Sequence, residues 1–280
     1  MRVIKSLFDF YIFSDLHVSI SCAALGVISF HNLHVPVQFK YVIVIFLSTL
    51  LAYQFIRIAD NFFSPIMSTP FPFNRYILLK YLFVIALFLV LILLLNSFNK
   101  NEIWLLIPIT IFTLTYAVPF VKIKNKKYSL RYVPAIKIFV IALVWSLFTV
   151  GFPNLNQWNE LNFWVEIVQR FSFIIAITIP FDIRDYKTDS GKLITLPQKI
   201  GVKYAKGLAL FLMLIFLFLG LLKTPFNINQ FSIEFCVFLL TIFLVTQIRE
   251  EKSIYFTAFW IESIPIFWLI LIYIVEVQFY

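Results

Sequence analysis

The chain has 280 residues, of which 61% are hydrophobic and only 13% are charged, and its formal net charge is +9. A soluble domain of this length does not need so many apolar residues to fill its core, so this class is excluded and an integral membrane protein is predicted. The basic excess does not indicate a nucleic-acid partner, because the Lys and Arg residues gather between apolar runs, where anionic lipid headgroups of the bilayer attract them.

Apolar runs of about 20 residues recur along the chain, and each can cross about 30 Å of hydrocarbon as a helix. The alternating segments typical of outer-membrane barrels are absent from the sequence. We therefore predict an all-α polytopic membrane protein in which residues 1–280 form a single nine-helix transmembrane domain. The nine spans are expected near residues 10–30, 38–58, 76–97, 102–120, 132–151, 163–181, 204–223, 231–248 and 254–275.

The first run resembles the apolar core of a secretory signal, but Asp15 and His17 interrupt it, so we interpret it as a retained helix. Most of the 23 Lys and Arg residues flank the N-terminus and the loops that leave even-numbered helices. The opposite loops hold only Lys40, Lys100 and Lys223. This bias predicts a cytoplasmic N-terminus and, with nine helices, a C-terminus outside. Low Gly, high Phe and high Lys contents favour a bacterial inner membrane.

Three aspartates follow the sixth run closely: Asp182, Asp185 and Asp189. If the helix continues through them, spacings of three and four residues place their side chains on one face. Three like charges at a membrane boundary repel one another unless a cation lies among them, and Mg²⁺ takes one or two carboxylates and completes its shell with water and phosphate oxygens. Alternatively, Arg184, Lys187 and Lys192 pair with the aspartates in a solvated loop. The spacing alone leaves both interpretations open.

Two stretches resemble the UbiA-type intramembrane prenyltransferases. The stretch FDIRDYKTDSGKLITLPQKIG resembles the family's second aspartate-rich motif, with matches at Asp182, Asp185, Asp189, Gly191, Lys192, Thr195, Leu196, Pro197 and Gly201. The stretch TYAVPFVKIKNKKYSLRYVPAIKIFVIALVW resembles the loop after the family's fourth helix and the helix that follows, with matches at Tyr116, Pro119, Lys122, Pro134, Lys137 and Trp145.

The resemblance implies a UbiA-like helical bundle around a central cavity. It also implies the transfer of an isoprenyl group from a diphosphate donor to a hydrophobic or aromatic acceptor, with the three aspartates as Mg²⁺ ligands and catalytic residues. Four basic residues would add positive charge at the diphosphate: Lys122, Lys137, Arg184 and Lys192. The rings of Tyr116 and Trp145 would then shelter the allylic cation, because aromatic faces attract positive charge.

The family's first aspartate-rich motif has no full counterpart in this chain. The end of the second span reads AYQFIRIADNFFSPIMSTP, which keeps only Asp60 and Asn61 and introduces Arg57. Arg57 could replace the missing metal as a bidentate cation on the diphosphate. Alternatively the site binds an isoprenoid lipid without ionising it, and the protein is a noncatalytic lipid-binding relative. A third interpretation places the Arg57 side chain among the lipid headgroups.

Two more ionisable residues fall inside predicted spans. Lys137 lies roughly 8 Å into the fifth span and Glu262 roughly 12 Å into the ninth, at 1.5 Å per residue. Lys137 either leans into the phosphate site or extends to the interface. We expect Glu262 to face the cavity, where it orients the acceptor or handles a proton, the alternative being a hydrogen bond to Ser or Thr on a neighbouring helix.

Overall fold

The computed structural model describes residues 2–63, 77–119, 121–123, 126–132, 136–186, 195–250 and 252–278. Nearly all of the described secondary structure is helical, which confirms the predicted fold class. The helices are α1 (Arg2–Phe13), α2 (Leu16–Asn32), α3 (Phe39–Phe63), α4 (Ile77–Leu95), α5 (Lys100–Ala117), α6 (Ile136–Ser146), α7 (Leu161–Arg184), α8 (Leu196–Ile200), α9 (Val202–Gly220), α10 (Ile228–Gln247) and α11 (Ile264–Gln278). One antiparallel hairpin follows α5, formed by β1 (Val121–Ile123) and β2 (Lys126–Tyr128).

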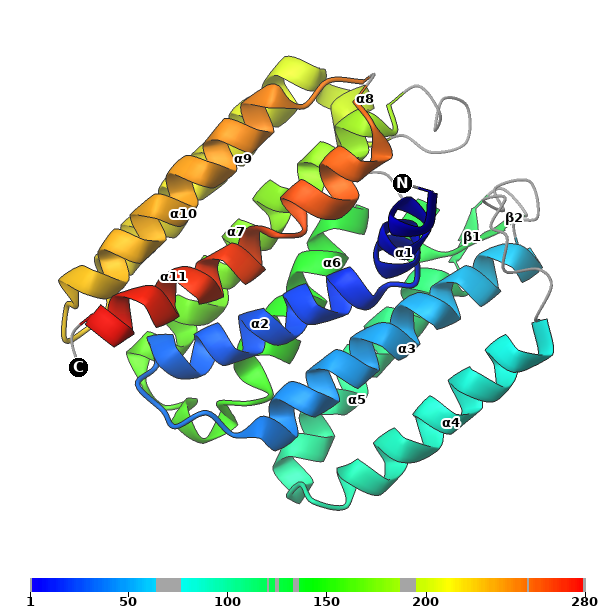
Figure 1. Ribbon diagram of the computed structural model, residues 1–280, viewed down its shortest axis with the longest axis horizontal. Coiled ribbons are helices and arrows are strands. Elements are labelled where there is room, and N and C mark those ends of the chain that lie inside the picture. Colours follow the sequence, from blue (N-terminus) through cyan, green and yellow to red (C-terminus); the bar gives the residue numbers. More distant parts are fainter. Residues whose placement is uncertain are drawn as a thin grey trace.

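Most of the long helices run side by side (Figure 1). Their contacts close into a ring. In order around the ring, packed neighbours are α2, α3, α5, α6, α7, α9, α10 and α11, and α11 returns to α2; α4 packs outside α3. The chain end of α7, the short helix α8 and the hairpin lie at one end of this bundle, and the α9–α10 turn lies at the other (Figure 1). We call the first the aspartate end, because α7 ends there at Arg184 just after Asp182.

Five described helical segments are long and apolar enough to cross a membrane, which makes the chain an integral membrane protein: Phe39–Ala59, Leu161–Arg184, Val202–Gly220, Ile228–Gln247 and Phe256–Val275. The bent pair formed by Val3–Phe13 and Leu16–Asn32 is a sixth candidate. Two apolar helices are shorter, Leu82–Leu95 and Ile136–Gly151. The number of nine spans therefore remains a prediction.

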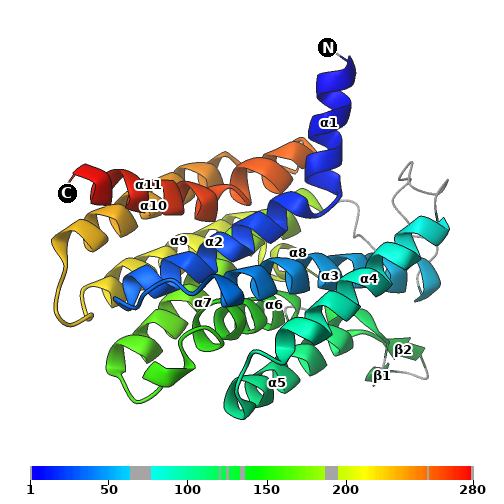
Figure 2. The same ribbon diagram turned by 60° about the horizontal axis from the view of Figure 1, so that its bottom comes forward.

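The first predicted span, residues 10–30, is not one continuous helix. α1 and α2 meet at an angle of 53° because Asp15 has a left-handed backbone with φ 68°. Aspartate is among the few residues that tolerate this conformation, since its short polar side chain can hydrogen-bond locally. Figure 2 shows α1 standing away from the bundle while α2 lies within it. The polar residue that interrupts the apolar run thus marks a sharp corner in the chain.

The last predicted span, residues 254–275, also contains an irregularity. It begins with a π-helical turn, Phe256–Ile261, and α11 starts after a short break at Glu262. A π-helical turn inserts an extra residue and is frequent at functional sites, because it re-aims the side chains around it. His17 of α2 binds this turn, with Nε2 3.2 Å from the Phe259 carbonyl oxygen and 3.2 Å from Ser263 Oγ. The hydrogen bonds of His17 therefore join the start of α2, next to the Asp15 corner, to the π-helical turn before α11.

Aromatic side chains fill the centre of the bundle between α7, α9 and α11. Phe173, Phe216 and Trp268 are each at most 1% exposed, and their ring centroids lie 5.5 to 5.7 Å apart. Edge-to-face pairs at such distances are favourable because the positive ring edge meets the negative face. α7 is the most enclosed span, with 78% of its apolar window buried. It is thus the most central of the candidate spans.

Candidate functional site

Asp182 points from the last turn of α7 toward α6 and is only 2% exposed. Its Oδ1 accepts a hydrogen bond from Nζ of Lys137, which lies 2.8 Å away at the start of α6. Lys137 also interacts electrostatically with Tyr116 near the end of α5. Three of the predicted site residues, from three different helices, are therefore brought together. Lys137 faces this cluster rather than the lipid headgroups.

Asp185 ends α7, and its carboxylate binds the neighbouring guanidinium. Nε and Nη2 of Arg184 donate to its two oxygens at 2.6 and 2.8 Å. The remaining Nη1 of Arg184 donates to Thr257 Oγ1 at 2.5 Å, which links α7 to the π-helical turn before α11. The contact matches one part of the alternative interpretation, in which Arg184, Lys187 and Lys192 pair with the aspartates. Thr257 was not predicted, because a single Thr in an apolar run gives no sequence signal.

The remaining predicted residues of this motif stay largely undescribed. α7 ends at Arg184 with Asp185 as its cap, so the helical face expected to carry all three aspartates ends before Asp189. Asp189 and Lys192 lie outside the described residues, as do Lys187 and the turn around Gly191. Lys122 lies on β1, paired in register with Lys127. Its role at the diphosphate remains a prediction.

Arg57 lies near the end of α3 and forms an ion pair with Asp15 at the α1–α2 corner. Gln54 of the same helix face donates to the second oxygen of Asp15 at 2.8 Å and to the Ser14 carbonyl at 3.1 Å. Asp15 is 4% exposed, so the corner is bound firmly to α3. Arg57 therefore reaches a buried carboxylate while its side chain stays 30% exposed, and its role at the diphosphate remains a prediction. The sequence signal for Asp15, the partner of Arg57, is that a charged residue interrupts the first apolar run.

Glu262 lies at the break between the π-helical turn and α11 and is half-buried. It interacts electrostatically with Asp15, Arg57 and Arg184, which come from the α1–α2 corner, α3 and α7. Tyr53 of α3 interacts electrostatically with the same carboxylate. The expected role of Glu262, facing the cavity to orient the acceptor or handle a proton, remains a prediction. The aspartate end thus gathers charged side chains from five helical segments.

Trp145 lies farther along α6 than Lys137, by about 12 Å at 1.5 Å per residue. Its partly buried ring packs against two apolar clusters, one around Phe173 and one around Phe152. No polar partner of its indole is present in the described part of the chain. Trp145 therefore acts as a packing residue here, and its predicted contact with a carbocation remains a prediction.

A second charged cluster is buried at the opposite end of α7. Lys223 Nζ donates to Glu166 at 2.7 Å and to Glu234 at 2.9 Å, and Arg170 Nη2 donates to Glu166 at 2.8 Å. We call these four residues the buried ion network; each is at most 5% exposed. Burial by itself would lower the pKa of Lys223, but the two carboxylates raise it above its usual value. The network contains two positive and two negative charges and is neutral.

Sequence analysis did not predict this network, because Glu166 and Arg170 share one apolar run whereas Glu234 and Lys223 come from other parts of the chain. Glu166 and Asp182 are sixteen residues apart on α7, or about 24 Å along its axis, so the network is remote from the aspartate end. It joins α7 to α10 and to the α9–α10 turn. Asn32 at the end of α2 also donates to both oxygens of Glu166, at 3.2 Å each. These contacts indicate a structural role.

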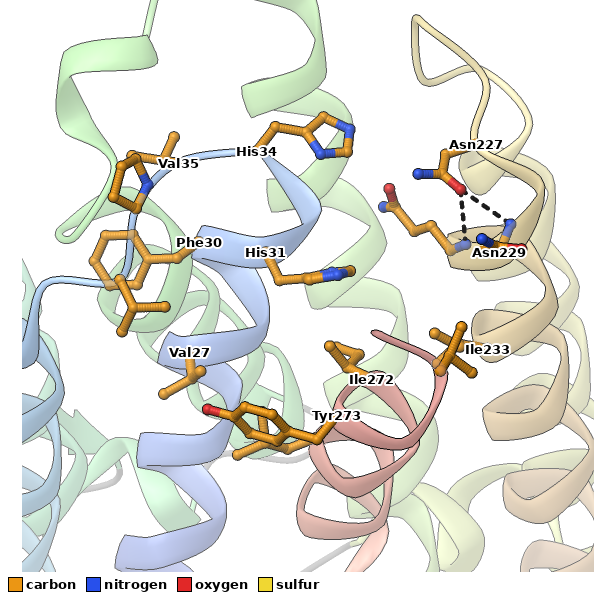
Figure 3. A pocket seen from close by; sticks show the side chains of 15 residues that line it. Val27, Phe30, His31, His34, Val35, Asn227, Asn229, Ile233, Ile272 and Tyr273 are labelled. Atoms are coloured by element: carbon orange, nitrogen blue, oxygen red, sulfur yellow. Dashed lines mark hydrogen bonds between the residues drawn. The ribbon is translucent and has the colours of Figure 1, made fainter. Parts of the chain in front are cut away.

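A cavity of about 520 Å³ lies close to this network, between the end of α2, the start of α10 and α11 (Figure 3). Apolar side chains such as Val27 and Ile272 form its walls, and polar groups such as His34, Asn229 and Tyr273 lie at its edge. None of its fifteen lining residues is Asp, Glu, Lys or Arg. A diphosphate and its cations need charged partners. The aspartate end, and not this cavity, is therefore the candidate site.

Comparison with known proteins identifies the fold. No family model matches the chain, and no curated protein matches it. The apo structure of a UbiA homolog from Aeropyrum pernix K1 has a TM-score of 0.71 at 13% identity, covering 93% of this chain and 98% of that chain. A structure of digeranylgeranylglyceryl phosphate synthase in membranes has a TM-score of 0.59 at 19% identity, covering 98% and 97%. The chain therefore has the UbiA-type fold, which confirms the predicted bundle.

Proposed function

We propose that this chain is a membrane prenyltransferase, which moves an isoprenyl group from a diphosphate donor to a hydrophobic or aromatic acceptor. The solved structures that share this fold, a UbiA homolog and a digeranylgeranylglyceryl phosphate synthase, support this proposal. The observation that carries the proposal is the set of charged pairs at the aspartate end, Lys137 with Asp182 and Arg184 with Asp185. Such pairs combine cations suited to phosphate oxygens with carboxylates suited to a hard metal ion.

We propose Mg²⁺ as the cation that the carboxylates of this site bind. Asp182 and Asp185 lie within one helical turn, and Asp189 is proposed as the third ligand. Within the described residues, no group of three or more acidic, His or Cys side chains could hold a metal, so the complete ligand set includes Asp189 by proposal only. When bound, Mg²⁺ supplies positive charge at the departing diphosphate oxygens.

The basic residues of the site act on the diphosphate in this proposal. Lys137 and Arg184 turn from their carboxylate partners toward phosphate oxygens, where a guanidinium can donate two parallel hydrogen bonds. Lys122 and Lys192 are proposed to add charge from the neighbouring loops. Tyr116, next to Lys137, presents its ring to the allylic carbon and stabilises developing positive charge.

A noncatalytic isoprenoid-binding protein is the second candidate, and one observation favours it. Arg57 stands where the resemblance predicts the family's first aspartate-rich motif, and Asp15 already holds it in an ion pair. In this candidate the diphosphate or another polar head binds to fixed cations and is not released. In the enzyme candidate, Arg57 contributes charge in place of a second metal ion.

The deciding experiment uses the full chain purified in detergent. Radiolabelled prenyl diphosphates of several chain lengths are incubated with a panel of acceptors and Mg²⁺, and both diphosphate release and prenylated product are measured. Asp182→Asn is compared with Glu160→Gln, an exposed acidic residue at the opposite end of the same helix. Release that requires Mg²⁺ and falls at least 100-fold in Asp182→Asn alone supports the enzyme. Tight donor binding without release in the wild type supports the lipid-binding candidate.

The orientation and location are part of the proposal. We propose a single nine-helix domain in a bacterial inner membrane, with the N-terminus and the aspartate end in the cytoplasm and the C-terminus outside. The concentration of Lys and Arg in the loops at the aspartate end supports this. Accessibility of single introduced cysteines to a membrane-impermeant reagent, in intact cells and in inverted vesicles, tests it.

A further inference from the structure

Glu262 differs from the other acidic side chains around the candidate site. Three of them, Asp15, Asp182 and Asp185, are held in ion pairs with Arg57, Lys137 and Arg184 respectively. Asp9 accepts a hydrogen bond from Tyr255 at 2.6 Å. In the part of the chain that the structure describes, the Glu262 carboxylate has no hydrogen bond and no ion pair within 4 Å. Among the acidic side chains named here, Glu262 alone is not bound to a fixed donor within the described residues.

The backbone around Glu262 holds this carboxylate in place. The Glu262 N–H donates to the Thr257 carbonyl at 3.2 Å across the π-helical turn, and the next residue, Ser263, binds His17. Its charged neighbours come from every side: Asp15 from the α1–α2 corner, Arg57 from α3 and Arg184 from α7. Tyr53 is the titratable neighbour on α3. A half-buried carboxylate among these groups remains accessible to a ligand bound at the aspartate end.

Prenyl transfer requires a proton acceptor. The bond between the allylic carbon and the diphosphate oxygen breaks, and its electron pair leaves with the diphosphate. A new bond forms from the allylic carbon to a carbon or oxygen atom of the acceptor, and that atom loses the proton it carried. A carboxylate in an ion pair is a weaker base, because the partner cation stabilises its charged form. A carboxylate with no fixed donor is therefore the better base.

We propose that Glu262 is the general base that takes the proton lost by the acceptor. This inference rests on the proposed function and assigns a step to a residue outside the aspartate-rich motif. Glu262 lies near Arg57, Arg184 and Asp15 but forms no hydrogen bond and no ion pair with them, so its carboxylate oxygens are available to a proton of the acceptor. General-base catalysis by a positioned side chain contributes roughly 100- to 10,000-fold to a rate.

The test separates proton removal from donor ionisation. In Glu262→Gln, the amide keeps the size of the side chain and cannot take the proton. We expect prenyl transfer to fall by roughly 100- to 10,000-fold. We also expect diphosphate release to water without acceptor, and binding of an unreactive thiolo-diphosphate donor analogue measured by calorimetry, to stay within about threefold of wild type.

In the wild type, transfer rises with pH as Glu262 loses its proton, and this rise is absent from Glu262→Gln. Glu262→Asp keeps a carboxylate and recovers part of the rate together with the pH-dependent rise.

A chemical measurement on the wild type does not depend on the folding of any variant. An apolar carbodiimide modifies carboxyl groups that lack fixed partners, so it should label Glu262 in preference to Asp182 by peptide mass spectrometry. Bound acceptor should protect Glu262 from this label. Unprotected labelling in the presence of a saturating acceptor would overturn the inference.

The remaining outcomes are also decisive. Transfer by Glu262→Gln within about threefold of wild type would overturn the role of Glu262 while leaving the prenyltransferase standing. Parallel loss of donor binding and transfer would assign Glu262 to the structure instead of the proton step. No diphosphate release by the wild type with any donor would overturn the proposed function itself, and the inference would fall with it.

Discussion

Replacing Lys223 by methionine tests whether the buried ion network stabilises the fold. The change removes the only lysine that contacts Glu166 and Glu234 in the described structure, and both carboxylates are at most 1% exposed. The network then contains two negative charges and the single positive charge of Arg170. Breaking a buried pair by removing one partner costs about 3–5 kcal/mol, because an uncompensated charge stays in a low-dielectric environment.

This free energy predicts a clear change in thermal stability. For a chain of this size, about 1 kcal/mol corresponds to a shift of roughly 2–4 °C, so we expect the apparent midpoint to fall by about 6–20 °C. The measurement is thermal unfolding of the detergent-purified protein at one heating rate, because unfolding of such proteins is commonly irreversible. Lys100→Met, at the exposed start of α5, is the matched control and should change the midpoint by less than about 2 °C.

A compensating variant isolates charge from packing. Lys223→Met combined with Glu234→Gln restores neutrality, because Glu166 and Arg170 remain as a pair. We expect the double variant to recover at least half of the lost stability. A double variant less stable than Lys223→Met, or a single variant as stable as the control, would refute the argument that uncompensated charge dominates.

Two further predictions concern buried contacts away from the candidate site. Gly220→Ala places a Cβ atom 2.2 Å from Oε2 of Glu234, which the network holds in place, so we expect the free energy of unfolding to fall by about 1–3 kcal/mol. Gly207→Ala on the same helix is the control, because its Cβ atom meets nothing within 4 Å and should not destabilise the fold. Tyr41→Phe removes the hydroxyl that donates to the buried carboxylate of Glu102 at 2.5 Å, and a loss of about 1.5–3 kcal/mol is expected. The unfolding midpoint measures all three variants, and equal midpoints for the two glycine variants would contradict the first prediction.

The helical class and the region of the site could be predicted from the sequence, because both depend on local patterns. Long apolar runs require helices in a membrane, where every backbone group must be bonded within the segment. The stretch around Asp182 and the stretch around Lys137 could each be predicted to contribute to the site. The structure joins these two residues in an ion pair. Glu262 could be singled out because an acidic residue inside an apolar run is costly without polar neighbours.

The sequence could not predict which residues of different helices form pairs. Asp15 and Arg57 are separated by 42 positions, and nothing local relates them. Asp15 interrupts its apolar run, but nothing in the sequence specifies its left-handed backbone, and the π-helical turn before Glu262 lies in a run that looks like ordinary helix. Side-chain polarity reports burial and not backbone geometry. The buried ion network was missed for a similar reason: Lys223 was interpreted as a loop residue, and its burial follows from the packing of α7 against α9 and α10.

The polar character of α7 has a consequence for how the chain is made. Its mean hydropathy of 1.4 is the lowest of the five candidate spans, and it carries Glu166 and Arg170 near its start. Arg170 lies four residues after Glu166, so the two are synthesised almost together. Lys223 lies 57 residues after Glu166 and therefore leaves the ribosome only after α9. A nascent chain stopped before Lys223 would hold α7 without its second counterion. We expect such an intermediate to depend on the insertion machinery, and α7 to become fully membrane-embedded only once the α9–α10 turn has been synthesised.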